Sequence, residues 1–165
     1  MSQMADKAAA ALLASLNSQR KHVLGILEGL PDEALQQPVL PSGWNCLGLV
    51  QHLTFDVERF WFQCVMAGEP LESAGVPDDA WHVGPDTSAE AVLSGYRRAI
   101  ERADEIIAPT PLDAAPAWWP DFFGTYRLDD LQQVMLHVIT ETACHAGHLD
   151  AVRELIDGRT WLVLT

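Results

Sequence analysis

The chain has little positive charge. Its 165 residues include ten Lys and Arg against 23 Asp and Glu, which gives a formal net charge of −13. A field of this sign repels phosphate backbones and anionic lipid surfaces. We therefore expect neither a nucleic-acid partner nor a membrane partner.

Cysteine is also scarce, and long apolar runs are missing. The three cysteines, Cys46, Cys64 and Cys144, are odd in number and show no CxxC spacing, so neither a disulfide framework nor a four-cysteine zinc site is expected. No apolar run approaches the roughly 18 residues that a membrane-spanning helix needs. Asp6 and Lys7 interrupt the alanine-rich start, which argues against a signal peptide. A reducing cytoplasm is the simplest compartment for this chain.

Helical periodicity accounts for most of the sequence. Apolar residues recur at helical spacing in four long segments, at about 5–29, 46–68, 87–108 and 129–157, and no segment has the pattern of a strand. We predict a single all-α domain over residues 1–165, a four-helix bundle whose long, proline-rich connections cross the bundle. One of these connections, residues 31–43, is expected to hold a single helical turn at 32–36.

Local signals mark where two of the helices begin. Ser42 or Asn45 is placed to cap the second segment. Thr87 and Glu90 have the spacing of a capping box at the start of the third segment.

The second segment and the last connection are both rich in large apolar residues. The second segment is apolar nearly all round, so we expect it to be buried on more than one side, either inside the domain or against a second subunit of a homodimer. The connection before the last helix contains Trp118 and Trp119. A long loop with adjacent aromatics is expected to fold over an apolar surface as a pocket wall, which makes both tryptophans candidates for contact with a bound small molecule.

Residues 131–157 contain an anomaly. On a helix of about 100° per residue, the apolar face of this segment consists of Val134, Val138, Val152, Leu155 and Ile156. The side expected to face water carries Thr142, Asp150 and Arg153. In the middle of the apolar face, within about 80° of arc, lie four ionisable residues, His137, Glu141, His145 and His148. Such side chains are costly to bury unless they are paired, neutral or bound to a metal.

The spacing of Glu141 and His145 suits metal binding. Residues four apart on a helix lie on one face, where they can supply two ligands to the same cation. His52 is the one histidine of the second segment and a candidate third ligand, which would leave a coordination position open, as in catalytic sites. Zinc suits two imidazoles and a carboxylate, and ligand type alone leaves nickel, iron(II) and manganese open. The alternative is that these are hydrogen-bonded core residues, and spacing does not decide between the two interpretations.

Two stretches carry a resemblance to a known family. GWNCLGLVQHLTFDVERFWFQCVMAGE, at 43–69, and HVITETACHAGHLDAVRELIDG, at 137–158, resemble the signature helices of the DinB-like superfamily. They are most similar to its actinobacterial branch, which includes mycothiol-dependent transferases and maleylpyruvate isomerase. The resemblance implies a four-helix bundle with up-down-down-up connectivity, often a homodimer.

The resemblance also implies roles for individual residues. The metal ligands would be His52, Glu141 and His145, with Glu141 at a position where many relatives have His. His148 stands where many relatives have Gln, so we interpret it as lining the pocket, and His137 as a supporting or core residue. Asp56 could orient His52 through the other ring nitrogen, and Cys144 is expected to be a small buried hydrophobe.

The implied chemistry is transfer of a thiol to a small electrophile. A low-molecular-weight thiol, mycothiol in actinobacteria, would enter the open metal position and react as a thiolate. Two other functions stay open at this point. One is hydrolysis of a small amide or ester by a metal-activated water, with His148 or His137 as the general acid or base. The other is a non-catalytic protein that binds a metal or a small ligand.

Overall fold

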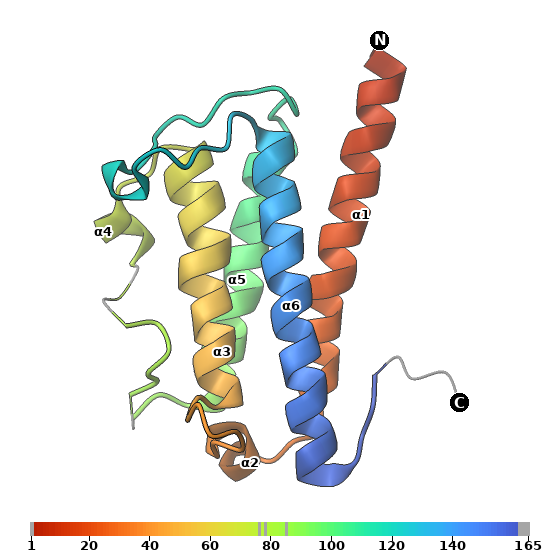
Figure 1. Ribbon diagram of the computed structural model, residues 1–165, viewed down its shortest axis with the longest axis vertical. Coiled ribbons are helices and arrows are strands. Elements are labelled where there is room, and N and C mark those ends of the chain that lie inside the picture. The colour runs from red at the N-terminus through yellow and green to blue at the C-terminus, as the bar shows by residue number, and fades with distance from the viewer. Residues whose placement is uncertain (1, 76, 78, 85, 162–165) are drawn as a thin grey trace.

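Four long helices run side by side in the computed structural model (Figure 1), which describes residues 2–75, 77, 79–84 and 86–161. The long elements are α1 (Ser2–Leu27), α3 (Cys46–His52) with its direct continuation η1 (Leu53–Met66), α5 (Ala89–Ile107) and α6 (Leu131–Asp157). The short elements are α2 (Asp32–Gln36), α4 (Leu71–Ala74) and the 3₁₀ turn η2 (Asp121–Phe123). Within the described ranges there is no strand, so the predicted all-α class is confirmed. None of the described helices is long and apolar enough to cross a membrane.

The helix directions give up-down-down-up connectivity. In Figure 1, α1 and α6 descend, whereas α3 with η1 and then α5 ascend. Because two consecutive helices point the same way, the connection after η1 must return along the whole length of the bundle. Within the bundle, α1 packs on α6, and α5 packs on α3 and η1. The predicted bundle with crossing loops is therefore confirmed, including the helical turn at residues 32–36.

The caps explain where the helices begin. The side chain of Asn45 accepts a hydrogen bond from the backbone N–H of Gly48 at 2.8 Å, so Asn45 and not Ser42 caps α3. At α5 the predicted capping box is wrong by one residue, because Ser88 is the N-cap and accepts from the backbone N–H of Ala91.

η1 is π-helical, and its apolar residues other than the half-buried Phe55 are buried within a single chain. It packs between α5 and α6 and also contacts α4. Aromatic rings of the 118–126 segment cover its C-terminal half, since Phe60 and Trp61 contact Trp118, Trp119 and Phe123. The apolar periphery of this helix is thus accounted for without a second subunit, and the homodimer stays a prediction.

The buried face of α6 differs from the one predicted. Thr142 and Arg153 are buried, whereas Leu155 is 63% exposed. The hydroxyl of Thr142 donates to the carbonyl of Val138, one turn back, so it can be buried at little cost. Arg153 donates to the carbonyl oxygens of Ile26 and Glu28 at the C-terminal end of α1, where helix carbonyls lack intrahelical partners. Arg153 therefore belongs to the contact between α1 and α6, and the polar group of Thr142 is satisfied within α6 itself.

A buried ion pair joins three of the helices. Arg20 of α1 makes two hydrogen bonds of 2.7 Å to the carboxylate of Glu58 on η1, and a third, also of 2.7 Å, to Asp104 on α5. Glu58 is fully buried, and its burial raises the pKa of the carboxyl although Arg20 opposes this. The pair fixes η1, and hence the end of α3, relative to α1 and α5.

Candidate metal centre

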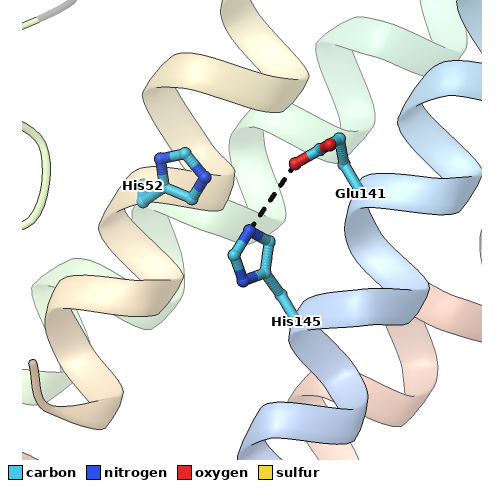
Figure 2. Close-up of side chains that lie close together, drawn as sticks. All are labelled: His52, Glu141 and His145. Carbon is cyan, nitrogen blue, oxygen red and sulfur yellow. Dashed lines mark ion pairs between the residues drawn. The ribbon is translucent and has the colours of Figure 1, made fainter. Parts of the chain in front are cut away.

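Three ionisable side chains from two helices meet at the boundary between α3 and α6 (Figure 2). His52 is the last residue of α3, and Glu141 and His145 lie one turn apart on α6. One ligand atom from each lies within 4.8 Å of the other two, a spacing at which the group could hold a metal ion. His52, Glu141 and His145 are each half-buried. The sequence predicted that Glu141 and His145 lie in the middle of the buried face of α6, but they lie at its edge.

One nitrogen of His52 is held and the other is unused. Nδ1 lies 2.8 Å from a carboxylate oxygen of Asp56, so Nδ1 carries the ring hydrogen and donates a hydrogen bond to Asp56. Nε2 is buried and has no hydrogen-bond partner among the described residues. A buried acceptor without a partner costs free energy, and an imidazole with one nitrogen bonded to a carboxylate is the usual arrangement of a metal ligand.

His145 is suited to stay neutral. Burial, and then the neighbouring His52, lower the pKa of His145 to about 4, although Glu141 opposes the shift. Nε2 of His145 lies 3.6 Å from a carboxylate oxygen of Glu141, and Nδ1 lies 3.4 Å from Nδ1 of His148. If Nδ1 donates to His148, then the lone pair on Nε2 is directed to the space shared with Glu141.

His137 and His148, the two other histidines of α6, lie next to this group but are not part of it. His148 is exposed and reaches the site through His145. His137 is half-buried, its ring lies 4.5 Å from the ring of Trp61, and burial lowers its pKa.

Two tryptophans at the site, Trp44 and Trp81, had no role assigned from the sequence. The ring of Trp81 stacks on His52 with centroids 4.4 Å apart and planes 18° apart, and it meets His145 edge-on at 5.8 Å. Trp44 lies 6.5 Å from Trp81 and 6.2 Å from His148. The sequence has six tryptophans spread over several segments, and only the adjacent pair at 118 and 119 has a pattern that indicates a pocket wall.

Trp118 and Trp119 lie around the C-terminal half of η1. Trp118 contacts Phe60, and Trp119 contacts Trp61 at 5.9 Å, which in turn contacts His137. Their position as a cover over an apolar surface agrees with the expectation for this loop. Contact with a bound small molecule stays a prediction.

Cys144 does not behave as predicted. It is exposed, whereas Cys46 and Cys64 are buried. The cause is helix geometry, because position 144 lies about 100° round the helix from His145, on the side away from the buried residues Thr142 and Ala146.

The donor set fits a divalent transition metal. Two imidazoles and a carboxylate, one of the imidazoles with an unpartnered buried nitrogen, match the ligands that zinc and its neighbours take in proteins. Three protein ligands leave at least one coordination position for a small molecule.

Comparison with known proteins identifies the family. Neither the curated proteins nor the solved structures contain a match to this chain. The family model for mycothiol-S-transferase matches residues 11–158, which include every residue of the candidate centre. The resemblance to the DinB-like superfamily is thereby confirmed, and the chain belongs to the mycothiol-S-transferase family.

Proposed function

We propose that this protein is a metal-dependent S-transferase that joins a low-molecular-weight thiol of the mycothiol type to small electrophiles. The family match supports the thiol and the reaction class. The observation that carries the metal dependence is the buried, unpartnered Nε2 of His52 beside Glu141 and His145.

In this proposal His52, Glu141 and His145 hold the metal. Zinc fits the donor set best, and nickel or iron are the alternatives. A divalent metal in this position lowers the pKa of a bound thiol, so that the thiolate exists near neutral pH. Asp56 contributes by keeping the proton on Nδ1 of His52, which leaves Nε2 free as a ligand.

The transfer step needs a proton acceptor and a dry pocket. The sulfur forms a bond to the electrophilic carbon, and the bond to the leaving group breaks with its electron pair. The thiol proton passes to His137, one turn before Glu141, or to the exposed His148 once its contact with His145 opens, because that contact occupies the one nitrogen of His148 that can accept a proton. The ring of Trp81 covers one face of His52 and so shields this ligand from water.

A second function shares the same residues. An exposed histidine next to a metal ligand is also placed as the general base of a hydrolase, so His148 favours hydrolysis of a small amide or ester as the alternative. A protein that only binds the metal or a small ligand would show neither activity. Contact of Trp118 and Trp119 with the bound thiol, the homodimer and the cytoplasmic location remain further predictions of this account.

The experiment is a thiol-transfer assay on tag-free protein loaded with Zn²⁺. We expect wild-type protein to accelerate the reaction of mycothiol with 1-chloro-2,4-dinitrobenzene, and His145→Ala to lose at least about 100-fold of that rate, since losing one of three ligands empties the site. Glu154→Ala, an exposed position on the same helix, is the matched control and should keep the full rate. Hydrolysis of activated esters without thiol consumption would favour the alternative function.

A further inference from the structure

The segment that carries Trp81 is fixed to α3 on both sides of that residue. Nε2 of Gln51 donates to the carbonyl oxygens of Ala80 and His82, at 2.9 and 3.0 Å. A Cβ atom added to Gly48 would fall well inside van der Waals contact with the carbonyl oxygen of Trp81. The backbone of Trp81 therefore rests directly on α3, at a place where only glycine leaves room.

This attachment fixes the indole relative to the candidate metal centre. On α3, Gly48 lies one helical turn before His52, and Gln51 is the residue directly before it. The same helix carries His52, the hydrogen bonds from Gln51 and the close contact at Gly48. The indole of Trp81 is therefore held in its stacked position on the imidazole, with the ring centroids 4.4 Å apart. Its position relative to His145, with centroids 5.8 Å apart, follows from the same attachment.

A cavity of about 390 Å³ lies between Trp81 and Trp44. Its lining consists of Ser42, Gly43, Trp44, Asn45, Trp81, His82 and Val83. This volume is in the range of small-molecule sites. None of His52, Glu141 and His145 lines this cavity. Its link to the candidate centre is the indole of Trp81, which lines the cavity and also stacks on His52.

The lining selects for a neutral, flat ligand. It contains no Lys, Arg, Asp or Glu, and its one titratable side chain, His82, pairs with the carboxylate of Asp79. The two indoles are inclined by 59° with centroids 6.5 Å apart, so a planar ring can stack on one and meet the other edge-on, the two arrangements that aromatic rings prefer. Indole faces are electron-rich, which favours an electron-poor ring.

We propose that the cavity between Trp44 and Trp81 binds a neutral, planar, electron-poor ring, and that Gly48 and Gln51 hold Trp81 in the position that this binding requires. The inference rests on the proposed S-transfer only in that the ring then belongs to the electrophile, with the indole of Trp81 in contact with both the ring and His52. Trp81 would thus select aromatic over aliphatic electrophiles.

Binding of an unreactive ring tests this directly. The probe is 1,3-dinitrobenzene, which has no leaving group, and its affinity for Zn²⁺-loaded protein is measured by calorimetry. We expect Trp81→Leu and Gly48→Ala to weaken binding at least about tenfold, the first by removing the stacking surface and the second by displacing it. Gln51→Ala tests the same displacement if Gly48→Ala does not fold.

Two controls match these variants. Gly95→Ala also adds a methyl group to a helical glycine, but nothing lies within 4 Å of it. Trp161→Leu removes a half-buried tryptophan that stacks on His22 of α1. Both should bind the probe as the wild-type protein does.

The outcomes separate the two proposals. If wild-type protein does not bind the probe, or if Trp81→Leu, Gly48→Ala and Gln51→Ala bind it with unchanged affinity, the cavity is not the ring site. If the probe binds as expected but no protein transfers thiol to 1-chloro-2,4-dinitrobenzene, the proposed function fails while the ring site stands. If both hold, Trp81→Leu should lower the rate ratio between 1-chloro-2,4-dinitrobenzene and iodoacetamide at least about tenfold, through KM more than kcat.

Discussion

His52 and Asp56 form a hydrogen bond of 2.8 Å across the junction of α3 and η1, and the nitrogen of His52 that does not take part is buried without a partner. This pair fixes both the orientation and the tautomer of the imidazole before any ligand arrives. Glu141 and His145 lie on one face of α6 by their spacing, and His148 is the neighbour of the second nitrogen of His145.

Removing the carboxylate of Asp56 should weaken metal binding. In Asp56→Ala, Nδ1 of His52 loses its acceptor, so the ring can rotate and take either tautomer. We expect the affinity for Zn²⁺ to fall about 10- to 100-fold, measured by competition with a chelating dye. Glu101→Ala, an exposed acidic position on α5, controls for the change in net charge. Equal affinities in both variants would mean that Asp56 does not support a ligand.

The three cysteines should differ sharply in reactivity. Cys144 is exposed, whereas burial raises the pKa of the Cys46 and Cys64 thiols to about 11. At pH 8 an aromatic disulfide reagent should modify one thiol rapidly, and peptide mass spectrometry should assign it to Cys144, since the thiolate is the reacting form. Fast modification of all three would contradict the burial of the other two. Transfer assays should therefore also be run with Cys144→Ser, which separates alkylation of the protein from turnover.

Two arginines offer a comparison of buried and exposed hydrogen bonds. Arg153 donates to two carbonyl oxygens at the end of α1, while Arg102 pairs with Glu69 and Glu105 on the surface. Arg153→Met should lower the free energy of unfolding by about 2 kcal/mol, because it removes the donor to the buried carbonyl of Ile26, whereas the carbonyl of Glu28 still accepts from Arg159. Arg102→Met should leave the urea midpoint unchanged. Equal midpoints for both variants would show that the contact of Arg153 with α1 is not stabilising.

Removing one partner of the Arg20–Glu58 pair should destabilise the protein strongly, whereas replacing both partners by apolar residues should destabilise it little. Glu58→Gln leaves a buried guanidinium with the partly exposed Asp104 as its one remaining carboxylate, so we expect a loss of about 3–5 kcal/mol in urea unfolding. In the double variant Arg20→Met, Glu58→Leu most of that stability should return, because neither charge remains buried. A double variant less stable than Glu58→Gln would indicate that the pair itself stabilises the fold.

Much of the fold follows from the sequence, because long amphipathic segments fix the helices and the prolines and glycines fix their ends. The pair Glu141 and His145 is also readable from spacing, since it depends only on helix geometry. Its connection with His52 depends on how two helices pack, and there the family resemblance supplied what periodicity could not.

The misses share a physical cause. Hydrophobicity placed Thr142 and Arg153 in water and Leu155 in the core, but the first two satisfy their polar groups locally or at the end of α1. The position of Trp81 beside His52 could not be predicted from the sequence. It depends on contacts with Gly48 and Gln51, which lie about 30 residues earlier in the chain. Such long-range contacts leave no periodic signal.

Metal content is the most direct test of the central claim that His52, Glu141 and His145 hold a divalent metal. Tag-free wild-type protein, Glu141→Gln and Glu154→Gln are expressed, purified and analysed side by side by elemental analysis. We predict about one transition metal per chain, most of it zinc, in the wild-type protein and in Glu154→Gln, and a clear loss in Glu141→Gln, since a carboxamide is a much weaker ligand than a carboxylate. Wild-type protein that contains no stoichiometric metal and binds none on titration with Zn²⁺, Ni²⁺ or Fe²⁺ would contradict the account.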